Sequence, residues 1–132
     1  MDDDSGSTPY LLLVDDNPDL REVLGTLLTM KGYTVESVED GVQALHSMKH
    51  HETLPNLVIT DLQMPGEDGG WGLRQRMLDD PELASVPVAV LSAVFPVPTK
   101  GSLDAVAYLE KPVELASLLA IIEKYITLPT VK

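Results

Sequence analysis

The chain has 132 residues, which is the length of one domain and enough to bury a single hydrophobic core. It holds 21 acidic residues against 9 basic ones, and the formal net charge of -12 argues against nucleic acid and anionic membrane surfaces as partners. Because cysteine is absent, disulfides, thiolate metal sites and cysteine nucleophiles are excluded.

The first eight residues, MDDDSGST, are acidic and low in complexity, so we expect a disordered lead over residues 1–8. They contain no apolar segment of the signal-peptide type. The longest apolar run, residues 86–97, is interrupted by prolines and is too short to span a bilayer. We therefore expect a cytoplasmic protein with one domain over residues 9–127 and a short tail over residues 128–132.

The first half of the chain alternates short apolar segments with amphipathic ones. Residues 10–14 have the length and the bulky content of a strand. Asn17 suits the N-cap of a helix whose apolar residues recur at helical spacing until Gly32. A second strand is predicted over residues 33–38, and a second helix over residues 41–50.

The second half continues this alternation. A strand is predicted over residues 56–60, a helix over residues 71–78 and a strand over residues 86–91. A last strand covers residues 106–109, and a final helix begins after Pro112 and runs to Ile126. This order predicts an α/β fold with one doubly wound, five-stranded parallel sheet and helices on both of its faces.

Chemically capable side chains follow four of the five predicted strands. Asp15 and Asp16 follow the first strand, Asp61 the third, Ser92 the fourth and Lys111 the fifth. Because ligands of such sheets bind beyond the carboxyl ends of the strands, we expect these side chains to converge. Each one alone has an ordinary explanation, such as a solvated turn or a helix cap. The occurrence of such side chains after four strands that end at one edge of the sheet favours a functional site.

The acids of this edge predict a metal site. Adjacent carboxylates repel one another and resist burial unless water or a cation satisfies them. Mg²⁺ prefers oxygen ligands and is usually held by one or two carboxylates together with a phosphate. We therefore expect Asp15, Asp16 and Asp61 to form a Mg²⁺ site.

Four segments resemble the receiver domains of two-component response regulators, the CheY-like family. They are "VDDN", "ITDLQMPGEDG", "VLSA" and "YLEKP", and the resemblance covers residues 10–126. It implies the flavodoxin-like strand order 2-1-3-4-5, for which CheY is a known example.

The resemblance also implies how the acids would act. Asp61 would accept a phosphoryl group from a histidine kinase or a phosphotransfer protein. Mg²⁺ would be held by Asp15, Asp16, Asp61 and the backbone carbonyl of Gln63. An aspartate is already ionised at neutral pH and can attack phosphorus directly. The chain would then catalyse only its own phosphorylation and dephosphorylation, and would not be an enzyme acting on other substrates.

Further roles follow from the same resemblance. Ser92 and Lys111 would contact the phosphoryl oxygens, and Tyr108 would turn inward after phosphorylation. The alternative for Tyr108 is a half-buried aromatic residue on an edge strand. The peptide bond between Lys111 and Pro112 would be cis, which is uncommon even before proline. A helix of the partner would dock near Leu20.

Two segments depart from the family pattern. "GEDGGWGL" holds one glycine more than usual, so we expect a loose first turn in the following helix and interpret the extra residue as a loop insertion away from the site. The chain after Ser92 is shorter than usual and carries Pro96 and Pro98, so the family's fourth helix should be shortened or lost.

Three functions stay open. The first is a phospho-accepting receiver domain of a phosphorelay, whose modification switches a surface that binds an unknown downstream protein. The alternative is a receiver-like binding module that acts without phosphorylation. The third is a Mg²⁺-dependent phosphohydrolase, which the sequence disfavours because Asn17 occupies the position where a second acid is usual. A nucleotide-binding function is weaker still, because no glycine-rich loop follows the first strand.

Overall fold

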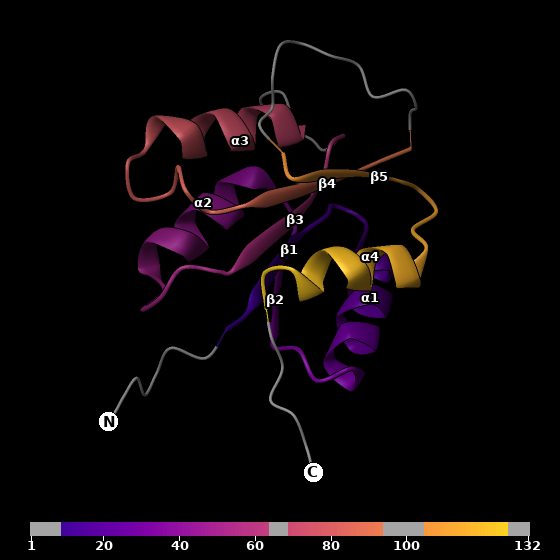
Figure 1. Ribbon diagram of the computed structural model, residues 1–132. Coiled ribbons are helices and arrows are strands. Elements are labelled where there is room, and N and C mark those ends of the chain that lie inside the picture. The colour runs from indigo at the N-terminus through magenta and orange to yellow at the C-terminus, as the bar shows by residue number, and fades with distance from the viewer. Residues whose placement is uncertain (1–8, 64–68, 94–104, 127–132) are drawn as a thin grey trace, which may run out of the picture.

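The computed structural model describes residues 9–63, 69–93 and 105–126 of the chain (Figure 1). Three expectations from the sequence fall outside these ranges: the disordered lead over residues 1–8, the shortened or lost fourth helix over residues 94–104, and the tail over residues 128–132.

Five parallel strands form one sheet in the order β2-β1-β3-β4-β5, which confirms the expected strand order. The strands are β1 (Leu11–Val14), β2 (Val35–Val38), β3 (Leu57–Asp61), β4 (Val88–Ser92) and β5 (Ala107–Glu110). Each begins and ends within two residues of its predicted bounds.

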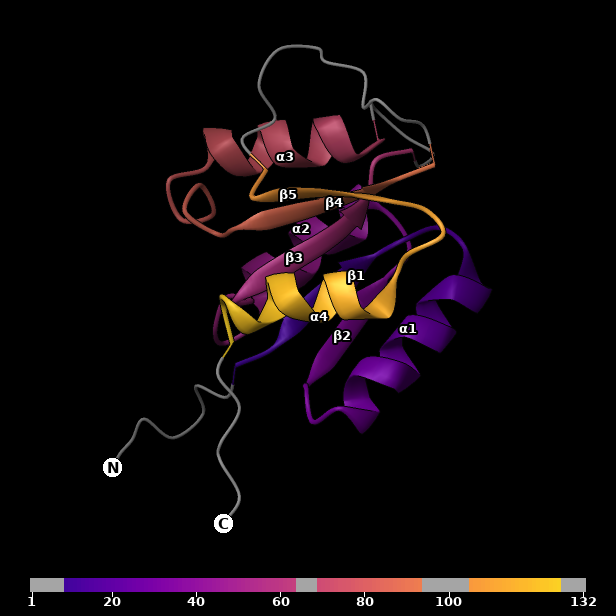
Figure 2. The same cartoon turned by 45° about the vertical axis from the view of Figure 1, so that its right-hand side comes forward.

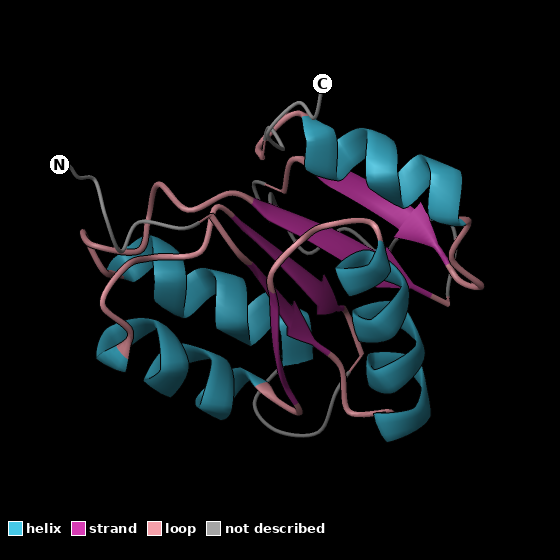
Figure 3. Cartoon of the chain, turned by 90° about the horizontal axis from the view of Figure 1, so that it is seen from below, coloured by secondary structure: helices cyan, strands magenta, loops and turns pink. Residues whose placement is uncertain are grey.

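Helices cover both faces of the sheet, as Figures 2 and 3 show. One face carries α1 (Pro18–Met30) and α4 (Leu115–Glu123), and the other carries α2 (Gly41–His50) and α3 (Gly69–Asp79). The doubly wound α/β fold is therefore confirmed. None of these helices is long and apolar enough to cross a membrane.

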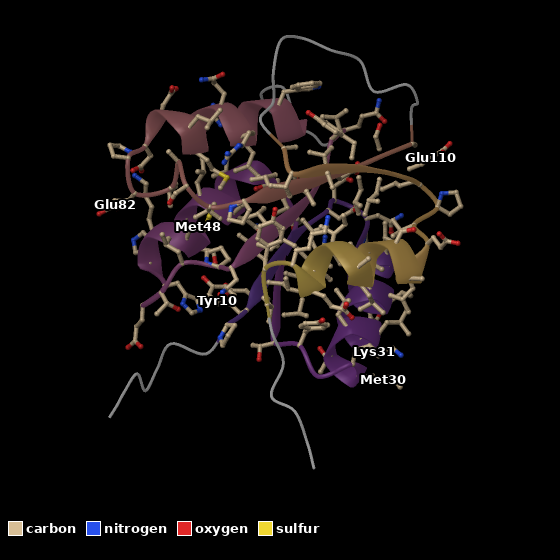
Figure 4. All side chains as sticks on the ribbon, viewed as in Figure 1. Tyr10, Met30, Lys31, Met48, Glu82 and Glu110 are labelled. Carbon is tan, nitrogen blue, oxygen red and sulfur yellow. The ribbon has the colours of Figure 1, made fainter. Side chains whose placement is uncertain are left out.

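Alternate side chains of the central strands enter two separate hydrophobic cores. Leu12 and Val14 of β1 pack with α2 and α3, where Met48 is also buried (Figure 4). Leu11 and Leu13 pack with α1 and α4 on the opposite face. Burial on both faces explains why β1 is apolar at every position. Because the strands are parallel, Asp15 after β1 and Asp61 at the end of β3 lie at the same carboxyl edge of the sheet.

Candidate functional site

The first part of the site follows β1 directly. Asp15 is fully buried, whereas Asp16 is exposed. As predicted, Asn17 caps α1: its side-chain oxygen accepts the backbone N–H groups of Asp19 and Leu20 at 3.0 and 3.2 Å. The Asn17 N–H donates to Asp15 Oδ1 at 2.9 Å. The start of the helix thus also orients the buried carboxylate.

Lys111 joins the ends of three strands. Its Nζ lies 3.1 Å from Asp15 Oδ2 and 3.1 Å from Asp61 Oδ2. Its backbone N–H donates to the Ser92 carbonyl at 2.8 Å, which keeps the end of β5 against β4. The peptide bond between Lys111 and Pro112 is cis, the isomer that the resemblance implied. The structure therefore brings together the lysine and the two buried acids.

The three acids form a compact group of oxygen donors. One carboxylate oxygen from each of Asp15, Asp16 and Asp61 lies within 4.8 Å of the other two. The Gln63 backbone N–H donates to Asp61 Oδ1 at 3.3 Å and so directs this carboxylate. A donor set made only of oxygens, with one exposed member, fits a hard divalent cation that keeps part of its water shell.

The pKa values of Asp61 and Lys111 are both raised, but for different reasons. Burial raises the pKa of Asp61 above its ordinary value, and the neighbouring Asp15 adds to this, while hydrogen bonds from Lys111 and Gln63 oppose it only in part. Burial alone would lower the pKa of Lys111, but its hydrogen bonds to Asp61 and Asp15 outweigh burial and raise that pKa. The folded protein thus disfavours the Asp61 charge and favours the Lys111 charge.

We expect Asp61 to protonate at a higher pH than an ordinary aspartate when Mg²⁺ is absent. Its side-chain ¹³C resonance, followed by NMR from neutral to acidic pH, should shift at a pH above the ordinary aspartate value. Excess Mg²⁺ should move this midpoint downward, because a bound cation favours the charged carboxylate. A midpoint below the ordinary value in the absence of Mg²⁺ would show that Lys111 outweighs burial, contrary to this expectation.

The remaining predicted site residues lie in two different environments. Ser92 ends β4 and is fully buried, and β4 pairs with β3 so that Leu91 lies beside Asp61. Tyr108 on β5 is 40% exposed, so it lies outside the buried cluster. Glu110, two residues further on, also points away from the sheet (Figure 4). The roles of Ser92 and Tyr108 after phosphorylation stay predictions.

Two side chains that the sequence analysis did not select hold the backbone of the acids. The Thr60 hydroxyl donates to the Asp61 carbonyl at 3.0 Å, and Arg21 Nη1 donates to the Asp15 carbonyl at 2.7 Å. Arg21 lies one helical turn after the N-cap Asn17, so helical spacing could have suggested it. No local signal distinguishes Thr60 from any other strand threonine.

The pair of glycines directly before Trp71 belongs to the first turn of α3 and lies close to the end of β3. α3 begins at Gly69, two residues before the predicted start, and the N–H of Gly70 donates to the Leu62 carbonyl at 2.9 Å. Gly70 therefore lies against the end of β3, where an added Cβ atom would come within 2.7 Å of the Asp61 carbonyl oxygen. That the glycine-rich segment holds a loop insertion relative to the family stays a prediction.

Most of the chain is similar to one known protein family. Residues 11–123 match the family model described as the response regulator receiver domain. The chain belongs to this family. It is accordingly a receiver domain, a signalling module of two-component systems, and the three acids and the lysine at one sheet edge are consistent with a phosphoacceptor role.

The receiver domain is similar to part of a longer curated protein. It is 34% identical over 112 residues to the probable transcriptional regulator ycf27 of Guillardia theta. The matched region covers 85% of this chain and 43% of that protein. The chain thus spans less than half the length of this relative.

Solved receiver structures are similar over nearly their whole length. The receiver domain of sensor histidine kinase PA1611 from Pseudomonas aeruginosa, with magnesium coordinated in its active site cleft, is 26% identical with a TM-score of 0.77, covering 90% of this chain and 98% of that one. The response regulator TrrA of Thermotoga maritima, in complex with Mg²⁺-BeF, is also 26% identical with a TM-score of 0.77, covering 89% of this chain and 99% of that one.

Proposed function

We propose that this receiver domain accepts a phosphoryl group on Asp61. The observation that carries the proposal is the position of Lys111 Nζ, 3.1 Å from both Asp15 and Asp61 beside three clustered carboxylates. Mg²⁺ would be held by Asp15, Asp16, Asp61 and the backbone carbonyl of Gln63. Such an arrangement supplies one nucleophile, one cation site and one fixed positive charge.

Asp61 would act as the nucleophile. One of its carboxylate oxygens attacks phosphorus, and a new O–P bond forms while the bond to the donor's leaving group, a histidine nitrogen or an acetate oxygen, breaks with its electron pair. Mg²⁺, when bound, neutralises charge on the carboxylates and on the phosphoryl oxygens. Hydrolysis of the aspartyl phosphate by water later restores the carboxylate, so the chain modifies only itself.

Two further side chains would stabilise the transferring group. The Lys111 ammonium has three N–H donors, so it can contact a phosphoryl oxygen and still hold one carboxylate. The Ser92 hydroxyl would donate a hydrogen bond to another oxygen. The product adds about -1.5 to -2 charges, which would alter the contacts of Lys111 and switch a surface that binds the downstream protein.

A groove beside the site is the proposed docking surface for the partner. It has a volume of about 550 Å³ and lies between α1 and the segment from β5 to α4, with Leu20, Val23 and Val113 in its lining. Asn17 and Lys111 line it too, so the groove is continuous with the acidic cluster. An apolar helix face of a histidine kinase or phosphotransfer protein, carrying the phosphohistidine, would fit there.

Val23→Asp is expected to slow phosphotransfer from a kinase without slowing phosphorylation by acetyl phosphate. Val23 is 53% exposed in the groove, so an aspartate there costs little folding free energy but would meet the apolar partner. With an autophosphorylated histidine kinase that modifies the wild-type chain, the transfer rate should fall on the order of tenfold. Val42→Asp is the matched control, since Val42 is 68% exposed on α2, on the opposite face of the sheet. Equal losses in both variants would contradict docking in this groove.

The test of the proposed function is the intact mass of the chain after incubation with acetyl phosphate. With Mg²⁺ we expect one added phosphoryl group, which peptide mapping places on Asp61, and with a chelator we expect none. Absence of the adduct while Mg²⁺ still binds would favour the phosphorylation-independent binding module. Turnover of a small phosphate ester without a lasting adduct would favour the phosphohydrolase.

A further inference from the structure

Gly70 lies unusually close to the backbone of the acceptor residue. A Cβ atom built at Gly70 would lie 2.7 Å from the Asp61 carbonyl oxygen and 3.0 Å from Leu62 Cα. Both are backbone atoms, which cannot rotate away as the end of a flexible side chain could. Gly70 itself is buried, and its N–H donates to the Leu62 carbonyl at 2.9 Å.

The segment that contacts Gly70 is fixed from its other side. The Asp61 carbonyl accepts the Thr60 hydroxyl at 3.0 Å, and the Leu62 N–H donates to the Leu91 carbonyl of β4 at 2.8 Å. A methyl group at Gly70 would therefore act against two hydrogen bonds that hold the end of β3. The same end carries the Asp61 carboxylate and continues directly into Gln63.

The helix that carries Gly70 is also held from behind. Leu73 and Met77 of α3 are buried in the core shared with α2. A Cβ atom at Gly41, the first residue of α2, would lie 3.4 Å from Leu73 Cβ. Because α3 is held between α2 and the end of β3, it cannot move away from Asp61 without losing packing in this core.

We propose that Gly70 is a positioning residue of the phosphoacceptor site. Its missing side chain lets the first turn of α3 lie directly on the end of β3, and this contact fixes the Asp61 carboxylate and the Gln63 carbonyl relative to Asp15. Gly70 contacts neither Mg²⁺ nor the phosphoryl group, and it acts through the backbone of Asp61. The inference rests on the proposed function of that residue.

The test compares three alanine variants by calorimetric titration with Mg²⁺. Gly70→Ala is expected to raise the dissociation constant for Mg²⁺ on the order of tenfold, the usual effect of disturbing groups that orient metal ligands. Gly25→Ala in α1 is the matched helical control, because nothing lies within 4 Å of its added Cβ. Gly41→Ala adds a methyl group between α2 and α3 at an ordinary contact distance, 3.4 Å from Leu73 Cβ, and controls for altered packing between these two helices. Both controls should bind Mg²⁺ as the wild type does, whatever their thermal midpoints.

The rate of phosphorylation at saturating Mg²⁺ distinguishes a misplaced metal site from a loss of folding. The slower phosphorylation of Gly70→Ala by acetyl phosphate should recover in large part at saturating Mg²⁺. Wild-type affinity in Gly70→Ala, or an equal loss in Gly41→Ala, would overturn the proposal. If Gly70→Ala does not fold, Thr60→Val replaces it: the Asp61 carbonyl then loses its hydrogen bond, weaker Mg²⁺ binding is expected, and an unchanged affinity would overturn the proposal.

A failure of the proposed function would look different. In that case the wild-type chain itself would bind no Mg²⁺ and form no adduct. The positioning contact would then be judged from amide NMR shifts in Mg²⁺-free protein. Gly70→Ala should displace the resonances of Asp61, Leu62 and Gln63, and Gly41→Ala should not. Unchanged resonances in Gly70→Ala would overturn the inference independently of the function.

Discussion

Asp61→Asn is expected to abolish the phosphoryl adduct and, at the same time, to stabilise the Mg²⁺-free protein at neutral pH. The adduct is lost because an amide is not a nucleophile toward phosphorus, so the rate should fall by at least about 100-fold. Stability should rise because the folded state raises the pKa of Asp61 and so disfavours its charge. Asparagine keeps the shape of the side chain without this charge.

The pH dependence of that gain is fixed by the direction of the pKa shift. For a carboxyl group whose pKa is higher in the folded state, the stabilising contribution is complete below the unfolded pKa and is lost as the pH rises through the folded pKa. Wild type and Asp61→Asn should therefore differ in thermal midpoint at neutral pH and converge in acid. Asp19→Asn, at an exposed position in the first turn of α1, is the control. A persistent adduct in Asp61→Asn would identify another acceptor, and a lower midpoint would show that the ion pair with Lys111 dominates.

Lys111→Met should have the opposite effect on stability. Lys111 lies 3.1 Å from the fully buried Asp15 and from Asp61, and its own side chain is 20% exposed. Removing one partner of a buried ion pair leaves an uncompensated charge, here expected to cost about 2–3 kcal/mol of unfolding free energy. Mg²⁺ should restore part of the loss, since a cation can take over the neutralisation of the same carboxylates. Phosphorylation by acetyl phosphate should slow on the order of 100-fold even with saturating Mg²⁺.

The matched control for this variant is Lys49→Met. Lys49 pairs with Asp80 at 3.0 Å, but its side chain is 54% exposed, so solvent screens this pair and its loss should change the unfolding free energy far less than the loss of Lys111. Urea unfolding with and without Mg²⁺ and the rate of adduct formation are the measurements. Equal losses for the two variants, or a wild-type rate in Lys111→Met, would remove Lys111 from the proposed chemistry.

Most strands could be predicted because strands that are buried on both faces are apolar over nearly their whole length. β1, β3 and β4 are buried at every position, and their short length and β-branched or bulky apolar residues distinguish such strands from buried helix segments. The C-terminal helix was less predictable. Its apolar spacing continues to Ile126, but α4 ends at Glu123. Ile126 is apolar because it is buried, although it lies beyond the turn that follows the helix. Periodicity marks which residues are buried better than it marks where a helix ends.

The site was predictable where topology alone decides it. Asp15 and Lys111 follow two strands of one parallel sheet and Asp61 ends a third, and the topology brings such strand ends together. Gly70 could not be predicted in the same way. Its helix propensity argues for a loose turn, and only the close approach of α3 to the end of β3 shows why glycine stands there.

The ion pair between Asp15 and Lys111 joins residues that are 96 positions apart. Synthesis begins at the N-terminus, so a growing chain carries all three acids long before it contains the lysine that compensates them. Closing so long a loop is entropically costly until the intervening strands have paired. The complete set of reactive groups therefore exists only once β5 has joined the sheet, and a chain interrupted before this point has its acids but lacks the arrangement that would make one of them an acceptor.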